Sequence, residues 1–173
     1  MEIRLTDYLE EWQTEFEKEV ARLKSIFGTL DIHFEHFGST AVKGMKAKPV
    51  IDMIGIVQSI DALEPFHDQL RLEGYEIVGE WGIIGRSLYR KGGENRTHHI
   101  HMYQFDNPQI ERHLVVRDYL RTHPLEVQRY NLLKIELSTQ YKNTKEYSKA
   151  KKDYVNELEK RAYEWHQLVK NSN

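Results

Sequence analysis

Apolar side chains near the start of the chain recur every three or four positions, which is the period of an amphipathic helix. The positions are Leu9, Trp12, Phe16, Val20, Leu23 and Phe27. They predict a helix from Thr6 or Asp7 to Phe27, and Gly28 is a suitable stop because glycine is favoured just after a helix.

The next part of the chain has the patterns of strands. Ile32 and Phe34 alternate with polar neighbours and predict a strand that ends at Gly38. The run 49–57 is apolar on both faces and predicts a buried central strand, followed by a helix over 59–73. Glycine-rich turns separate three further extended segments, expected at 75–79, 87–91 and 97–105.

The last third of the chain changes to helical periodicity, and we expect helices at 109–122, 124–141 and 145–170. This order of elements predicts an α+β fold with a mixed sheet flanked by helices. We expect residues 1–173 to form one domain, with a sheet-bearing core over about 1–106 and a helical part over about 107–173.

Composition excludes several classes of protein. The 173 residues carry 25 basic and 27 acidic side chains, a formal net charge of −2, which does not favour nucleic acid as a partner. There is no cysteine, so disulfides, zinc–thiolate sites and thiol nucleophiles are excluded. No apolar run approaches the ~18 residues of a membrane span. We therefore expect a cytoplasmic protein that does not enter membranes.

Asp52 is the most informative residue, because a carboxylate within an apolar strand is costly unless it is paired or binds a metal. Gly38 and Ser39 follow the preceding strand, and such a turn lets backbone N–H groups approach a phosphate. The combination suits a nucleotide phosphate held at the turn and a divalent metal held by Asp52. The structural alternative is that Asp52 only caps the turn.

Two histidines share one face of the extended segment 97–105. His99 and His101 point the same way as Thr97 and Tyr103, whereas Ile100 and Met102 lie on the opposite, core-facing side. The pair could ligate a metal, contact phosphate or act as acid and base. It could equally be a polar sheet face, and Asp52 could complete a metal site only if the two strands are neighbours.

Basic residues surround these segments, and arginine suits bidentate phosphate contacts. They are Lys43, Lys46, Lys48, Arg86, Arg90 and Arg96. A second set on the later helices could form a basic and aromatic surface for RNA, but interleaved glutamates favour an ordinary solvated face. That set comprises Tyr130, Lys134, Tyr141, Lys145, Lys149, Lys151 and Lys152.

Five segments together resemble the GrpB family, a UPF0157-type group of uncharacterised proteins placed in the nucleotidyltransferase superfamily. The segments are His36-Phe-Gly-Ser-Thr-Ala-Val42, Ala47-Lys-Pro-Val-Ile-Asp52, Gly82-Ile-Ile-Gly-Arg86, Arg96-Thr-His-His-Ile-His101 and Glu111-Arg-His-Leu-Val-Val-Arg-Asp-Tyr-Leu120. The resemblance runs from Trp12 to near Trp165 and implies a mixed sheet with a cleft beside the Gly-Ser turn.

The resemblance also implies roles for individual residues. Asp52 matches the first metal carboxylate, for Mg²⁺ or Mn²⁺, while His99 and His101 are candidate ligands or acid–base groups. The expected phosphate-binding residues are Gly38, Ser39, Lys48, Arg86, Arg90 and Arg96. Ile54 departs from the superfamily pattern, because a second carboxylate usually stands there.

Two functions follow from this resemblance. One is a metal-dependent nucleotidyltransferase that binds a nucleotide or another phosphorylated small molecule, with the acceptor left open. The other is a non-catalytic ligand-binding, protein-interaction or folding-assistance module of the GrpB type, with a protein partner. GrpB-like domains also occur fused to dephospho-coenzyme A kinase, and the absence of a Walker-type phosphate loop here predicts a stand-alone version.

Overall fold

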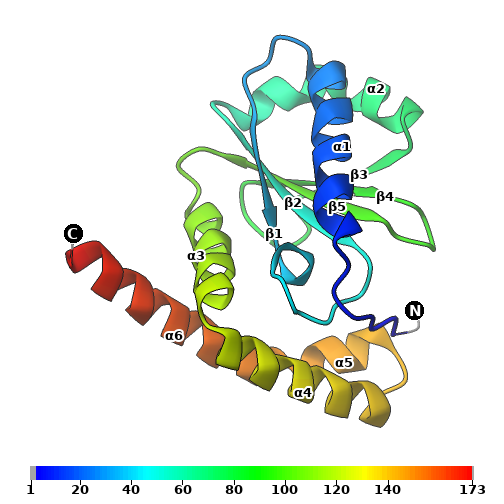
Figure 1. The fold of residues 1–173 in the computed structure, drawn as a ribbon. Helices are drawn as coiled ribbons and strands as arrows, with labels where there is room; N and C mark the ends of the chain where they lie inside the picture. Colours follow the sequence, from blue (N-terminus) through cyan, green and yellow to red (C-terminus); the bar gives the residue numbers. More distant parts are fainter. Residues whose placement is uncertain (1–2, 173) are drawn as a thin grey trace.

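A computed structural model describes residues 3–172 of the chain (Figure 1). Its centre is a five-stranded mixed sheet in the order β1-β2-β5-β4-β3, in which β2 and β5 are parallel and the other neighbours antiparallel. The strands are β1 (His33–Phe37), β2 (Ile51–Val57), β3 (Tyr75–Gly79), β4 (Arg86–Lys91) and β5 (His98–Gln104). The expected strands are therefore all present, and β2 lies inside the sheet.

One face of the sheet is covered by the helix that precedes β1 and the two helical segments that follow β2. These are α1 (Glu11–Phe27), the 3₁₀ segment η2 (Ile60–Phe66) and α2 (His67–Leu72). The core on this face contains Met53 of β2 with Ile100 and Met102 of β5, all of which are inaccessible to solvent. The predicted core-facing side of β5 is thus confirmed.

The opposite face of the sheet is only partly covered. Helix α3 (Pro108–Thr122) packs through Ile110 and Leu114 against Phe37, Ile54 and Tyr103. The remaining helices are η1 (Ser39–Ala41), α4 (Pro124–Gln140), α5 (Thr144–Ala150) and α6 (Lys152–Asn171).

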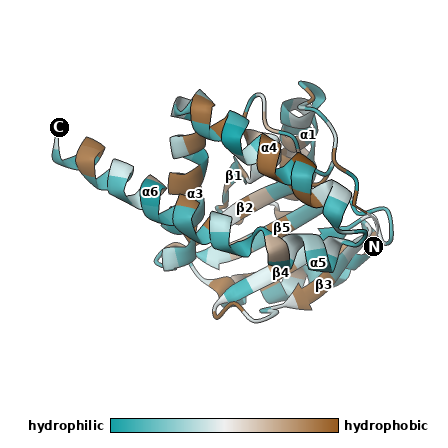
Figure 2. Cartoon of the chain, turned by 90° about the horizontal axis from the view of Figure 1, so that it is seen from below, coloured by the Kyte–Doolittle hydropathy of each residue, from teal (hydrophilic) through white to brown (hydrophobic). Residues whose placement is uncertain are grey.

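The C-terminal helices form a second apolar core that is continuous with α3. Val115 of α3, Val127 of α4 and Leu158 of α6 belong to this core. Both α4 and α6 mix hydrophobic and hydrophilic residues along their length (Figure 2). No helix in residues 3–172 is long and apolar enough to cross a membrane.

Three predicted helix boundaries are wrong. The first helix begins at Glu11, because Thr6 instead forms an isolated bridge with Ala47. The segment 59–73 divides into η2 and α2, and Pro65, which has no N–H to donate, lies in η2. The last helix divides at Lys151, whose N–H bonds back to the Lys149 and Tyr147 carbonyls.

Candidate functional site

The Gly-Ser turn lies directly against Asp52. Strand β1 pairs with β2 so that Phe37 stands opposite Asp52, and η1 follows at once. Gly38 has φ 76° and ψ −171°, a conformation that only glycine adopts readily. A Cβ atom at Gly38 would lie 3.0 Å from Asp52 Oδ2, so the absence of a side chain brings the turn and the carboxylate together.

Parallel pairing of β2 with β5 brings both histidines to Asp52. Asp52 is in register with His99, and His101 lies two residues further along the same face. Asp52 Oδ1 is 3.6 Å from His99 Nδ1 and 3.5 Å from His101 Nε2. One ligand atom from each of the three residues lies within 4.8 Å of the others, so the structure contains a possible Asp/His metal site.

The charge state of Asp52 follows from its burial and from the two neighbouring histidines. Burial by itself raises the pKa of Asp52, but the neighbouring His101 and His99 outweigh it and lower the pKa well below its ordinary value. Arg86 Nη1 lies 3.3 Å from His101 Nδ1, and arginine has no acceptor, so His101 Nδ1 accepts this hydrogen bond. In the neutral His101 ring the proton is therefore on Nε2 and faces Asp52.

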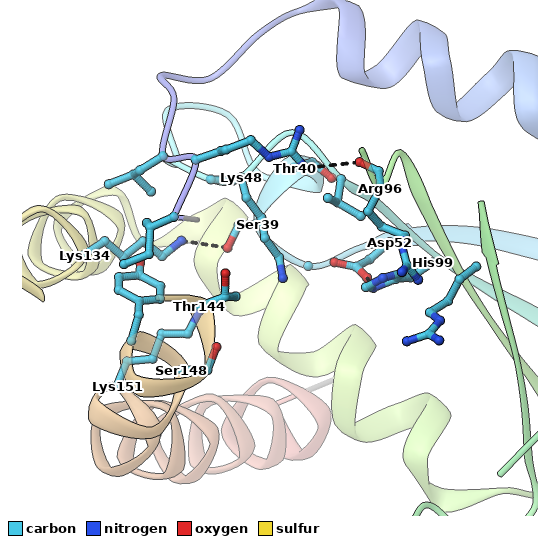
Figure 3. Close-up of a pocket in the computed structure, with 18 residues that line it drawn as sticks. Ser39, Thr40, Lys48, Asp52, Arg96, His99, Lys134, Thr144, Ser148 and Lys151 are labelled. Carbon is cyan, nitrogen blue, oxygen red and sulfur yellow. Dashed lines mark hydrogen bonds and ion pairs between the residues drawn. The ribbon is translucent and has the colours of Figure 1, made fainter. Parts of the chain in front are cut away.

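A cavity of about 320 Å³ opens between the site face of the sheet and the C-terminal helices (Figure 3). Gly38, Ser39, Asp52 and His99 line it on the sheet side. Six basic side chains also line it, namely Arg4, Lys48, Arg90, Arg96, Lys134 and Lys151. Asp52 is the one acidic side chain among the described lining residues, so basic side chains dominate the lining of this cavity in a chain of net charge −2.

Lys134 of α4 connects the helical part to the turn. Its side chain is almost fully buried, and Nζ donates to Ser39 Oγ at 2.8 Å and to the Lys46 carbonyl at 2.7 Å. Nζ also lies 4.2 Å from the centre of the Tyr130 ring. Burial, and then repulsion from Lys151, lower the pKa of Lys134 well below its ordinary value. A negative charge nearby would favour the protonated form of Lys134 and so raise its pKa again.

Lys151 and Lys48 enter the cavity from opposite sides (Figure 3). Burial and the charge of Lys48 lower the pKa of Lys151 to about 8, although Asp52 acts in the other direction. Arg96 Nη1 is buried with no hydrogen-bond partner in residues 3–172. Lys48, Lys151 and Arg96 thus give this part of the cavity a basic lining.

A model of the GrpB protein family matches residues 2–161. The chain belongs to the GrpB family. The UPF0157 protein YqkA of Bacillus subtilis is 43% identical over 167 residues, covering 96% of this chain and 49% of YqkA. Glutamate-rich protein GrpB of Alkalihalophilus pseudofirmus is 32% identical over 163 residues, covering 91% of this chain and 94% of that protein. The chain thus spans about half the length of YqkA but nearly all of the A. pseudofirmus protein.

Solved structures support the fold of this GrpB-family chain. The conserved protein GrpB from Enterococcus faecalis superposes with a TM-score of 0.89 at 38% identity, over 94% of this chain and 99% of that chain. A mutant of the Cid1 poly(U) polymerase bound to MgATP gives a TM-score of 0.50 at 14% identity, over 74% of this chain and 42% of that chain. The predicted family and nucleotidyltransferase-like fold are confirmed.

The residues of this GrpB-family chain fit one divalent ion better than two. Ile54, where a second carboxylate was expected from the superfamily pattern, is completely buried in the cluster of Phe37 and Tyr103. The donor set is one carboxylate and imidazole nitrogens, which suits Mn²⁺ better than the all-oxygen preference of Mg²⁺. If His101 Nε2 bound the ion, the ring proton would have to move to Nδ1, where it would face the N–H of Arg86. Two donors would then oppose each other, so Asp52 and His99 are the better pair of ligands for the ion.

The structure brings most of the sequence-predicted residues to the cavity, but not all. Arg86 lies outside its described lining and is buried, with Nε and Nη2 donating to the Glu80 and Trp81 carbonyls. His101 also lies outside the described lining, although its Nε2 is 3.5 Å from Asp52 Oδ1.

Sequence reasoning assigned the later lysines to a solvated face and so missed Lys134 and Lys151 as lining residues. It also missed Arg4, which lies in an N-terminal segment without a motif. The one available signal was a lysine, Lys134, placed between apolar helical positions.

Proposed function

We propose that this chain binds a nucleotide or a similar phosphorylated small molecule in the basic cavity and acts as a metal-dependent nucleotidyltransferase. The observation that carries this proposal is the cavity itself. Asp52 and the Gly38–Ser39 turn face six basic side chains from separate parts of the chain. An enclosed, positively charged cavity raises the local concentration of phosphorylated ligands and favours their binding.

Asp52 and His99 would hold the divalent ion in this proposal, with Mn²⁺ preferred to Mg²⁺. When bound, the ion would supply positive charge to phosphate oxygens and orient them. His101 Nε2 lies 3.5 Å from Asp52 Oδ1 while Arg86 donates to its other ring nitrogen, and the nearby imidazole helps to keep the carboxylate ionised. Asp52 stays anionic at neutral pH because its pKa is lowered.

The phosphate groups would be held by the turn and the lysines. Lys134 donates to Ser39 Oγ, which leaves the Ser39 hydroxyl proton free to point at a ligand oxygen. In nucleotidyl transfer, an acceptor forms a bond to the α-phosphorus as the bond to the pyrophosphate oxygen breaks. Lys48 and Lys151 are placed to neutralise the charge that the leaving pyrophosphate gains.

A second candidate is a ligand-binding module without catalysis. Ile54 favours this reading, because it removes the second carboxylate that two-metal chemistry requires. The two candidates share the same ligand and the same cavity, and they differ only in whether the bound nucleotide is cleaved.

The decisive test compares wild type with Asp52→Asn in thermal unfolding, with ATP, GTP, CTP or UTP and with Mn²⁺, Mg²⁺ or EDTA. A ligand at 100 times its Kd stabilises the native state by about 2.7 kcal/mol, which raises the Tm of a chain this size by roughly 5–10 °C. We expect an Mn²⁺-dependent rise with at least one nucleotide in wild type, and loss of the metal dependence in Asp52→Asn.

Asp31→Asn is the matched control, since Asp31 is exposed and outside the described cavity lining. It should respond as wild type does. An assay for pyrophosphate release then distinguishes the two candidate functions, because only a nucleotidyltransferase would release it. An unchanged Mn²⁺-dependent shift in Asp52→Asn would show that the metal site is elsewhere, and no shift with any nucleotide would refute the proposal.

A further inference from the structure

The turn between β3 and β4 exposes a large aromatic side chain in a strained conformation. Trp81 is 58% exposed and has φ +40°, and it is the one non-glycine residue with positive φ in residues 3–172. A bulky residue in this region is a real outlier, and such strain concentrates at functional positions. Glycine would fit this backbone better, so the indole ring itself needs an explanation.

The turn is held firmly by its own contacts. Arg86 Nε donates to the Glu80 carbonyl at 3.2 Å, and Arg86 Nη2 donates to the Trp81 carbonyl at 3.0 Å. The Gly85 N–H donates to Glu80 Oε2 at 2.6 Å. The indole ring is therefore presented to solvent from a fixed backbone, which lowers the entropy cost of using it for binding.

The ring is connected to the cavity through Arg90. The Arg90 guanidinium carbon lies 4.3 Å from the centre of the Trp81 ring, and Glu76 holds the guanidinium with bonds of 2.8 and 3.2 Å. Arg90 also lines the cavity and is in register with His99, which is in register with Asp52. Two strand spacings of about 4.8 Å separate the backbones of Arg90 and Asp52, so a ligand that contacts both residues spans roughly 10 Å.

We propose that Trp81 and Arg90 form a subsite for a planar aromatic ring, the base of the nucleotide whose phosphates occupy the cavity. This inference rests on the proposed function, because the cavity must hold the phosphate end. The exposed indole provides a stacking surface that every nucleobase can use, and the Arg90 guanidinium, which lies over the ring, adds positive charge to the stack. Arg90 can also contact phosphate, but an exposed indole offers little to a ligand that lacks a ring.

The test measures two affinities by calorimetry in the presence of Mn²⁺, one for inorganic tripolyphosphate and one for each of the four nucleoside triphosphates. We expect wild type to bind at least one nucleotide more tightly than tripolyphosphate. Trp81→Gly should weaken that nucleotide about tenfold or more, as loss of one stacked base does, and leave the tripolyphosphate affinity unchanged. Trp81→Phe, which keeps a ring, should retain most of the nucleotide affinity.

Two features keep the result interpretable. Glycine accepts the φ of +40°, so Trp81→Gly removes the ring without adding backbone strain. Ile84→Ala is the matched control, because Ile84 is 89% exposed on the same turn, and it should bind as wild type does.

Equal affinities for tripolyphosphate and every nucleotide, or equal weakening of both by Trp81→Gly, would overturn the ring subsite while the phosphate site stands. Failure of tripolyphosphate itself to bind would overturn the proposed function, and the ring subsite with it.

Discussion

Replacement of Gly38 by alanine tests whether the turn must touch the carboxylate. The backbone at Gly38 has φ 76° and ψ −171°, a region that is essentially restricted to glycine. An added Cβ would lie 3.0 Å from Asp52 Oδ2 and 3.3 Å from Asp52 Cβ. The substitution therefore introduces backbone strain and a steric contact at the same position.

The two terms can be estimated separately. The conformation costs an alanine on the order of 1–3 kcal/mol. The contact forces the turn or Asp52 to move, which costs on the order of 1 kcal/mol more. A loss of about 2–4 kcal/mol lowers the Tm of a chain of this size by roughly 5–15 °C. Nucleotide affinity should fall as well, because the displaced carboxylate no longer faces the cavity.

Thermal unfolding followed by circular dichroism measures the loss, and Gly28→Ala is the control. Gly28 also has positive φ, 61°, but a Cβ added there would meet no atom within 4 Å, so it reports backbone strain alone. In an Asp52→Ala background, Gly38→Ala should cost less, since the contact with Oδ2 is gone. Equal losses at Gly38 and Gly28, with nucleotide affinity intact, would refute the reasoning.

Two further predictions concern the lysines of the cavity. Affinity for tripolyphosphate should fall as the pH rises through about 8, where Lys151 loses its charge, and Lys151→Met should flatten this profile in calorimetry. The effect on stability has the opposite sign. The pKa of Lys151 is lowered from 10.5 to about 8, so its burial destabilises the fold below pH 8. This cost, about 3 kcal/mol, is relieved as the pH rises from 8 to 10.5. Lys134→Met should reduce tripolyphosphate affinity at least tenfold, while the Tm changes by only a few degrees. The variant loses two hydrogen bonds of about 1.5–3 kcal/mol each, but it also removes the cost of burying a cation, and the two effects offset each other. A large fall in Tm with unchanged affinity would assign Lys134 a purely structural role.

Local patterns predicted the strands and their faces well. Alternation along 97–105 placed His99 and His101 on one face and Ile100 and Met102 on the other, and the two apolar side chains are fully buried. Alternation could not identify the neighbouring strand. The parallel pairing of β2 with β5 joins segments more than forty residues apart, and it is this pairing that brings Asp52 to the histidines.

The lysines of the C-terminal helices show where sequence reasoning fails. Lys134 belongs to a helix that also carries Glu126 and Glu136, a mixture typical of a solvated face, yet only 2% of Lys134 is exposed. Its burial depends on how α4 packs over the Ser39 turn, a contact between residues 95 positions apart. Arg86, four residues before Arg90, is also buried, and it donates to the carbonyls of Glu80 and Trp81. The sequence pattern of the strand gave no sign of this burial.

The buried Ile54 has a consequence for how charge is balanced in the cavity. A carboxylate at this position would be enclosed by Phe37 and Tyr103, where an unpaired charge is costly, so Asp52 acts without a neighbouring acid. With one carboxylate in the described lining, the protein's own cations would have to balance most of the charge on the proposed phosphorylated ligand. Lys134 and Lys151, which line the cavity from α4 and the α5–α6 junction, would supply part of that charge, and the helical third would then be part of the site. Asp52→Asn should therefore abolish the effect of Mn²⁺ on tripolyphosphate affinity yet leave metal-independent binding measurable, whereas Lys134→Met should weaken binding with and without metal. Complete loss of binding in Asp52→Asn would show instead that the metal, and not the lysines, holds the ligand.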